Sequence, residues 1–183
     1  MDLCEIIDNN KNFSKKDIDD INNNYKDIGW FNCMGFALGD YDWLDLDAFV
    51  TPADDWEYIH RNNEDENYSN IFKGNFRENQ DFMEYMEDIA EDCADEVDRC
   101  YVNCRRVSSI DDLLPCEYLV GFKIGPTDFH FIRRFSNGLW VEKPGGMNLR
   151  TMSEEVALSS SWPHNGWDYC TKTHWFAVLN KEI

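Results

Sequence analysis

The spacing of hydrophobic and polar residues along the chain changes near residue 98, from a helical to an extended pattern. From residue 81 to about residue 95, apolar side chains recur at helical spacing with acidic residues between them: Phe82, Met86, Ile89 and Cys93. A stripe of this kind predicts an amphipathic helix with one buried and one acidic face. After residue 98 the pattern becomes that of extended chain. We therefore expect helices first and strands later.

Two shorter helices are predicted in the first 40 residues. Ser14 is followed three positions later by Asp17, and this spacing is typical of a capped helix start. The helix would run to Tyr25 and bury Ile18 and Ile21. A second, short helix is expected to begin at Asn32.

The second half of the chain predicts β-strands. Residues 100–104 alternate between apolar and polar positions, and the β-prone segments 117–124, 128–135 and 174–179 follow. Ser136, Asn137 and Gly138 indicate a hairpin turn that leads into a further strand, LWVEK. We expect an antiparallel sheet of about four or five strands. Helices that precede such a sheet are typical of an α+β fold.

Length and composition favour one folded domain over residues 1–183, with an acidic helical and loop insertion at about residues 40–98. The chain of 183 residues is 43% hydrophobic and 15% aromatic, which is too apolar for a disordered chain. No apolar run approaches a membrane span, and the acidic start MDLCEIIDNN differs from a secretion signal. Seven cysteines without a disulfide pattern indicate reduced thiols, so we expect a cytoplasmic protein with no membrane partner.

The formal net charge of −19 is concentrated in one segment. Residues 40–98 contain 20 acidic and 3 basic residues, a net charge of −17. This segment includes the polar stretch HRNNEDENYSN, which we interpret as a surface loop. Its charge repels nucleic acid phosphates and attracts basic protein surfaces, so direct nucleic acid binding is not expected. The alternative is an acidic face that serves only solubility.

A cysteine and a histidine in separate segments supply candidate catalytic chemistry. Cys33 stands at the expected helix start in NCMGFALG, where the positive end of the peptide dipole favours a thiolate. His130 lies on an expected strand in DFHFIRRFSNGLWVEKPGG. A thiolate paired with an imidazole is the minimum equipment for nucleophilic acyl transfer. The alternatives are a buried cysteine that packs as a small apolar residue, and a histidine that fills a strand position.

These two segments, 27 residues together, resemble the papain-like superfamily of thiol hydrolases, and most closely an uncharacterised bacterial and phage family within it. The resemblance is carried by these residues: Asn32, Cys33, Ala37, Leu38, Asp128, His130, Arg133, Gly138, Trp140, Lys143 and Gly145. It implies a papain-like fold, with N-terminal helices packed on a C-terminal antiparallel sheet. It also implies that Cys33 is a nucleophile and His130 a base.

The third catalytic member has two candidates, Glu142 and Asn148. Relatives tend to have a histidine where this chain has Glu142. A three-residue hairpin loop is expected to pair Arg134 with Glu142 and so place the carboxylate on the histidine's face, whereas a two-residue loop is expected to pair Arg133 with Glu142 and turn it away.

Metal and cofactor signals are weak. Cys93, Cys100, Cys104 and Cys116 lack paired zinc-knuckle spacing, and carboxylate pairs such as Asp54 with Asp55 arise by chance in so acidic a segment. No phosphate-binding glycine loop is present. We therefore expect no metal and no cofactor.

Two functions follow from these observations. The first is a papain-like cysteine hydrolase or transferase that acts on an amide or thioester bond of a peptide or protein substrate. The second is an acidic inhibitor that mimics nucleic acid and binds a basic nucleic-acid enzyme, as phage counter-defence and anti-CRISPR proteins do. Its candidate partner-binding residues are the carboxylates of the acidic helix: Asp81, Glu84, Glu87, Asp88, Glu91, Asp92, Asp95 and Glu96.

Overall fold

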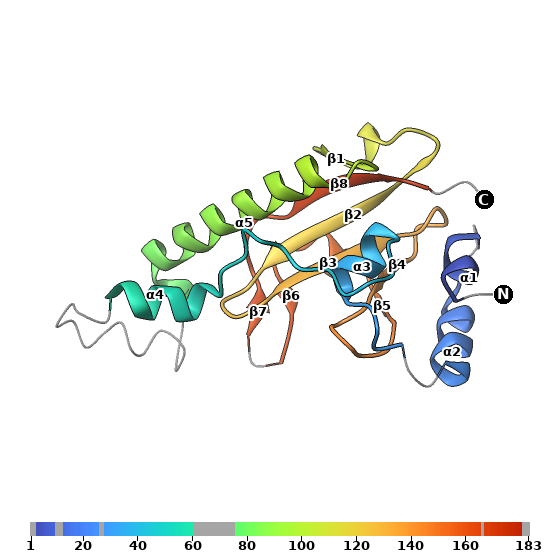
Figure 1. Ribbon diagram of the computed structural model, residues 1–183, viewed down its shortest axis with the longest axis horizontal. Helices are drawn as coiled ribbons and strands as arrows, with labels where there is room; N and C mark the ends of the chain where they lie inside the picture. Colours follow the sequence, from blue (N-terminus) through green and yellow to red (C-terminus); the bar gives the residue numbers. More distant parts are fainter. Residues whose placement is uncertain (1–2, 10–12, 26–27, 61–75, 166, 181–183) are drawn as a thin grey trace.

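A computed structural model describes residues 3–9, 13–25, 28–60, 76–165 and 167–180 (Figure 1). Its helices are α1 (Leu3–Asn9), α2 (Lys15–Asn24), α3 (Cys33–Leu38), α4 (Pro52–His60), α5 (Gln80–Cys100) and α6 (Glu154–Ala157), with short 3-10 helices η2 (Phe76–Glu78) and η3 (Ile110–Asp112). Its strands are β1 (Cys104–Val107), β2 (Glu117–Ile124), β3 (Phe129–Arg134), β4 (Trp140–Glu142), β5 (Arg150–Met152), β6 (Trp162–Pro163), β7 (Asp168–Tyr169) and β8 (His174–Leu179). The fold is α+β, as the sequence predicts.

Six of the strands form one sheet in the order β1-β8-β2-β3-β4-β5, and every neighbouring pair is antiparallel. The strands β6 and β7 make a separate two-stranded sheet. The main sheet therefore has more strands than the sequence predicts. The strand β5 was missed because its three residues are too few to show a clear period of two.

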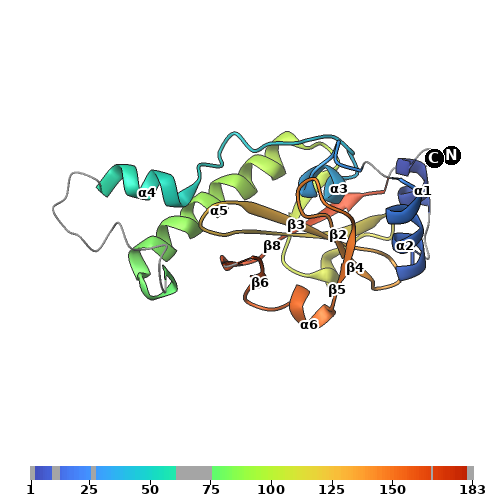
Figure 2. The same ribbon diagram turned by 90° about the horizontal axis from the view of Figure 1, so that it is seen from below.

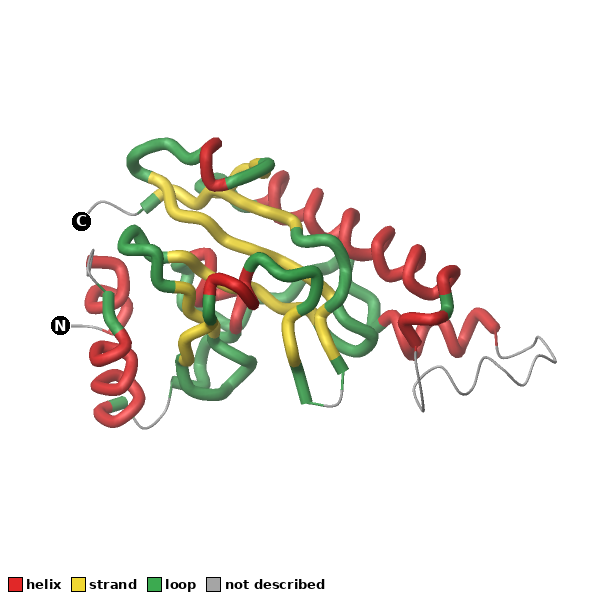
Figure 3. The backbone as a smooth tube through the Cα atoms, turned by 180° about the vertical axis from the view of Figure 1, so that it is seen from behind, coloured by secondary structure: helices red, strands yellow, loops and turns green. Residues whose placement is uncertain are grey.

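The main sheet is covered on both faces (Figure 2). On one face α3 and α5 pack against aromatic and aliphatic side chains of β2, β3 and β8, among them Phe122, Phe131 and Phe176. On the other face α6 and the β6–β7 hairpin enclose a second cluster around Trp140 and Trp162. Seen from behind in Figure 3, α1 and α2 lie at one end of the sheet and α4 at the other. The side chains of each strand therefore alternate between two different cores.

The three predicted helices are confirmed. Ser14 caps α2 in a reciprocal box with Asp17, and Asn32 caps α3. The acidic helix α5 begins after its cap Asn79 and buries the predicted apolar stripe. It continues to Cys100 because Ala94 and Val97 extend that stripe, so the extended chain predicted for residues 100–104 is wrong up to Cys104, where β1 begins.

The β3–β4 hairpin corrects the predicted register. The structure pairs Ile132 with Glu142, so both predicted pairings, with Arg134 and with Arg133, are wrong. The turn has three residues between the hydrogen-bonded Phe135 and Leu139, and Gly138 has the expected positive φ of 89°. The three-residue loop of the first prediction is therefore present, but it pairs Glu142 with a residue two positions earlier on β3 than expected, and a shift of two keeps Glu142 on the same face.

The predicted surface loop at residues 60–70 lies, apart from His60, outside the described residues, and the description of residues 40–98 as an insertion stays a prediction. In the described chain no helix combines the length and the apolar character that crossing a bilayer requires.

Candidate active site

The short helix α3 fixes the position of Cys33. Its cap Asn32 accepts hydrogen bonds from the backbone N–H of Gly35 at 3.0 Å and of Leu44 at 3.3 Å, and its side-chain amide donates to the Leu44 carbonyl at 2.5 Å. Gly35 lies so close to the next loop that a Cβ there would be 2.0 Å from the Asp42 carbonyl oxygen. The cap and the close approach together hold the first turn, which carries Cys33, against the sheet.

The strands β3 and β4 bring His130 toward Cys33. The pairing of β3 with β4 covers Ile132 to Arg134, so β4 ends before it reaches the level of His130. The helix α3 packs against β3 and β4, and the Cys33 thiol lies 4.0 Å from the backbone carbonyl of Phe129, the residue before His130. The Cys33 side chain also raises the pKa of the His130 ring.

Glu142 binds the other side of the imidazole. Its Oε2 atom lies 2.7 Å from His130 Nε2, and its Oε1 atom accepts a hydrogen bond of 2.6 Å from Arg150 Nε. His130 and Glu142 are 2% and 7% exposed, so this contact is shielded from water. Because Nε2 is taken by the carboxylate, Nδ1 is the ring nitrogen that remains for a second partner. His130 and Glu142 thus form a buried pair on the strands next to Cys33.

The electrostatics favour a charged imidazole. Burial alone would lower the pKa of His130, but its hydrogen bonds to Cys33 and Glu142 raise the pKa to about 9. Burial in turn would raise the pKa of Glu142, but the contacts with His130 and Arg150 hold it below its usual value. An imidazolium and a carboxylate therefore face one another near neutral pH.

Two aromatic side chains hold the imidazole in place. The ring of Tyr169 is stacked on His130 with a centroid distance of 4.9 Å and an interplanar angle of 17°. The indole of Trp162 meets the imidazole edge to face at 6.2 Å. These residues come from the β6–β7 hairpin, which packs on the sheet face that carries His130. They restrict the ring to the orientation that joins the thiol to the carboxylate.

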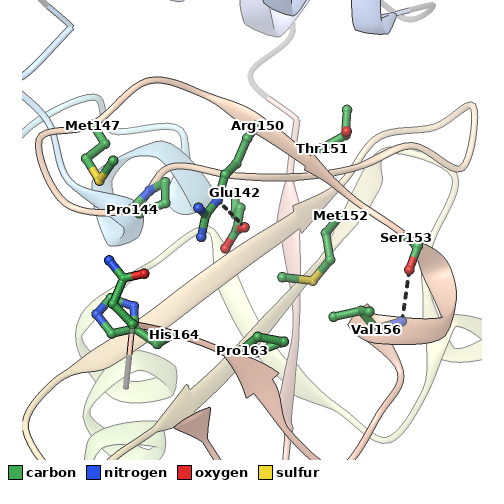
Figure 4. Close-up of a pocket in the computed structure, with 11 residues that line it drawn as sticks. Glu142, Pro144, Met147, Arg150, Thr151, Met152, Ser153, Val156, Pro163 and His164 are labelled. Carbon is green, nitrogen blue, oxygen red and sulfur yellow. Dashed lines mark hydrogen bonds and ion pairs between the residues drawn. The ribbon is translucent and has the colours of Figure 1, made fainter. Parts of the chain in front are cut away.

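A groove of about 480 Å³ lies beside Glu142 (Figure 4). Arg150 reaches over the Glu142 carboxylate on one side, and His164 with Pro163 forms the other side. Its walls combine apolar and polar side chains and are completed by Pro144, Met147, Thr151, Met152, Ser153, Val156 and Asn165. The groove leads to the carboxylate, whereas the thiol itself is only 5% exposed.

The second candidate for the third member, Asn148, is exposed in the turn before β5. Within the described residues it makes no hydrogen bond to His130, whose Nε2 is bonded to Glu142. Of the two candidates, Glu142 is therefore the one that can orient the imidazole. Sequence reasoning missed Arg150 and Tyr169 because each reaches the site through a strand pairing that leaves no local signal.

The acidic helix divides its carboxylates between internal contacts and solvent. Four of the eight candidate residues bond to residues outside the helix: Glu87 to the Lys172 amide, Glu91 and Asp95 to Arg106, and Glu96 to the amides of Asp47 and Ala48. The other four are exposed on α5, and of these Glu84 accepts a hydrogen bond from Gln80 within the helix: Asp81, Glu84, Asp88 and Asp92. Half of the candidate residues thus connect α5 to other parts of the fold.

The described residues contain no group of three or more histidine, cysteine or carboxylate side chains arranged to hold a metal ion. All seven cysteines are free thiols. No model of a protein family matches the chain, and no curated protein and no solved structure matches it.

Proposed function

We propose that this protein is a papain-like cysteine hydrolase or transferase that acts on an amide or thioester bond of a peptide or protein. Cys33 is the nucleophile, His130 the base and acid, and Glu142 the residue that orients the imidazole. The observation that carries the proposal is the buried pair of His130 and Glu142, with the Cys33 thiol 4.0 Å from the carbonyl of the neighbouring Phe129. The resemblance of the segments around Cys33 and His130 to papain-like enzymes supports the same reaction class.

The arrangement accounts for each proton in an acyl transfer. His130, as an imidazolium, already holds the proton that the Cys33 thiol gives up, and the Cys33 sulfur attacks the carbonyl carbon of the substrate. As the tetrahedral intermediate collapses, the bond to the leaving nitrogen or sulfur breaks and the imidazolium donates its proton to that atom. A water molecule then gives a proton to His130 and attacks the thioester, which releases the acid and restores Cys33. In a transferase an amine replaces the water.

Glu142 contributes by fixing the charge and the orientation of the ring. Its negative charge stabilises the imidazolium that forms when the thiol is deprotonated. Arg150 holds the second carboxylate oxygen, so the carboxylate cannot rotate away from His130 without breaking that bond. Because Cys33 is 5% exposed, a substrate carbonyl reaches the sulfur only when the side chains that cover it move.

Alkylation of the native protein tests this proposal. We expect iodoacetamide to label Cys33 faster than the exposed Cys100 at pH 6 to 7, although Cys33 is buried, because only a thiolate is strongly nucleophilic. Peptide mapping by mass spectrometry after short exposures gives the rate for each of the seven cysteines. A His130→Ala variant should lose this selectivity. Faster labelling of Cys100 than of Cys33 in the folded protein would refute the proposal.

The acidic inhibitor is a second candidate because of one feature of α5. The exposed carboxylates Asp81, Glu84, Asp88 and Asp92 follow one another at helical spacing and form a stripe along the helix. Such a stripe can bind a basic groove built for nucleic acid. Replacement of these four by Asn or Gln should abolish salt-sensitive retention on an immobilised basic nucleic-acid enzyme, and Cys33→Ala should not. Retention that requires Cys33 would contradict this function.

A further inference from the structure

The strand β5 forms one edge of the main sheet. In the order β1-β8-β2-β3-β4-β5 it pairs with β4 on one side, and no strand of the described chain pairs with it on the other. Arg150 and Thr151 are exposed, and Met152 is partly buried. Backbone N–H and C=O groups on an open edge can pair with another extended chain. The register of the sheet decides which residue of β5 presents such groups.

The hairpin between β3 and β4 determines which way the backbone of Thr151 turns. The Phe135 N–H donates a hydrogen bond of 2.8 Å to the Leu139 carbonyl, and hydrogen-bonded pairs recur at every second position of an antiparallel ladder. The pair of Arg133 with Val141 is therefore also hydrogen-bonded, so Val141 turns its backbone groups toward β3. Val141 is the partner of Thr151 on β4. Because this second pair is then not hydrogen-bonded, Thr151 turns its N–H and C=O away from β4, to the open edge.

The side chain of Asn22 on α2 supports this direction independently. It accepts a hydrogen bond of 3.1 Å from the Leu149 N–H and donates one of 2.8 Å to the Leu149 carbonyl. These are the two bonds that a residue on a neighbouring antiparallel strand would make. Residues two positions apart in extended chain turn their backbone groups to the same side, so Thr151 faces outward as Leu149 does. In the part of the chain that the structure describes, no hydrogen bond outside the strand pairs reaches the Thr151 backbone.

The groove beside Glu142 runs along the same edge. Side chains alternate along β5, so Arg150 and Met152 point to the face that carries Glu142. Both side chains line the groove, together with Val156 (Figure 4). In a strand paired antiparallel with β5, the residue opposite Thr151 would point to the other face of the sheet, and its two neighbours would point into the groove. Met152 and Val156 offer an apolar contact to one of these neighbours.

A peptide paired antiparallel with β5 would run toward the proposed active site. Its C-terminal direction leads from Met152 to Arg150, because β5 itself runs from Arg150 to Met152. Arg150 pairs with Glu142, and Glu142 pairs with Ile132, which stands two residues after His130 on β3. Two further residues in the same direction therefore reach the level of His130.

We propose that β5 binds an extended segment of the substrate as a seventh, antiparallel strand of the sheet. The N–H and C=O of Thr151 pair with one substrate residue, and the residue before it in the substrate places an apolar side chain against Met152 and Val156. Backbone pairing of this kind supplies affinity, and the groove supplies selectivity. The inference rests on the proposed function only in that this segment belongs to the substrate. It narrows the substrate to a peptide or protein that presents an extended chain.

Affinity selection from a library of acetylated hexapeptides tests the proposal. The library has every amino acid except cysteine at each position, and the immobilised protein is Cys33→Ala, which lacks the proposed nucleophile. We expect the retained peptides to share an apolar residue. A further Thr151→Pro substitution should weaken their binding at least about tenfold, because proline has no N–H to donate. The fold should survive, since proline is tolerated on an edge strand where the N–H faces outward. The matched control is Thr151→Val, which keeps the N–H and should bind the same peptides equally well.

Methylation of the peptide backbone gives a second measurement if Thr151→Pro folds poorly. We expect methylation of the one peptide nitrogen that donates to the Thr151 carbonyl to abolish binding, and methylation of the next nitrogen along to preserve it, because only every second residue turns toward β5.

Three results would overturn the proposal: no retained peptide, equal binding to Thr151→Pro and Thr151→Val, or methylation effects that do not depend on position. Binding that depends on the Thr151 N–H, in a protein whose Cys33 is labelled no faster than Cys100, would support the added strand and count against the hydrolase. Fast labelling of Cys33 without such binding would leave the hydrolase standing and refute the added strand.

Discussion

The Glu142→Gln variant gives the sharpest test of the electrostatics at the site, because it removes one charge and keeps the shape. The pKa of His130 is about 9 in the folded protein, against about 6.5 in an unfolded chain. The folded state therefore holds the imidazole proton more tightly than the unfolded state. This stabilisation is fully present below about pH 6.5 and is lost as the pH rises through 9.

The magnitude can be worked out for the window from pH 6.5 to 8. Each pH unit removes about 1.4 kcal/mol while the folded state alone holds the proton, so the contribution of His130 to the free energy of unfolding should fall by about 2 kcal/mol. Lys123 and Lys143, whose pKa values are lowered to about 8, lose about half of their protons by pH 8, and this loss raises stability with pH. The rise occurs in the wild type and in the variant alike, so the difference between the two proteins gives the effect of His130.

In Glu142→Gln the imidazolium loses its carboxylate while burial continues to disfavour the charge. We expect the contribution of His130 to the fall in the free energy of unfolding between pH 6.5 and 8 to shrink to less than about 1 kcal/mol. Urea denaturation followed by tryptophan fluorescence at both pH values measures it. The control is Glu117→Gln, since Glu117 forms its ion pair with Arg105 at a distance from the histidine. A fall in the variant as large as that in the wild type would refute the reasoning.

Two further predictions concern the supports of the site. Gly35→Ala should lower the free energy of unfolding by at least about 2 kcal/mol in chemical denaturation, because its Cβ would be 2.0 Å from the Asp42 carbonyl oxygen. The control is Gly146→Ala, which should change this free energy little because the nearest atom to its Cβ would be 4.0 Å away. Equal effects of the two substitutions would contradict this account. Arg150→Met should lower the free energy of unfolding by less than about 1 kcal/mol, because the Arg150 side chain is 51% exposed. It should nevertheless lower the pKa of His130 in an NMR titration. An unchanged His130 titration would argue against a role of Arg150 in orienting Glu142.

Local signals were sufficient for several elements. The box of Ser14 with Asp17 marks the start of α2, and the stripe from Phe82 to Cys93 defines α5. Gly138 marks the hairpin turn because a positive φ costs glycine little. Each of these features depends on residues within a few positions of one another. The α+β class follows from them without any knowledge of tertiary contacts.

The sequence also identified Cys33 and His130 of the proposed active site, but not how Glu142 is brought to them. Cys33 and His130 were expected to meet, and the face of Glu142 depended on a register that the turn sequence alone did not fix. The observed pairing of Ile132 with Glu142 differs from both expectations, although one of them had the right face. Register is decided by the packing of two opposite faces against different cores, and these cores are assembled from segments distant in sequence.

What the sequence determined by itself, then, is the set of elements and the residue types that can perform thiol chemistry, since periodicity and capping act over short distances. Only the tertiary structure decided that Glu142 rather than Asn148 contacts the imidazole, that Arg150 and Tyr169 hold this pair, and that four of the eight candidate carboxylates on α5 bond to residues outside that helix. The reason is physical: the charge state of a buried group depends on which partners surround it, and those partners come from strands that only the fold brings together.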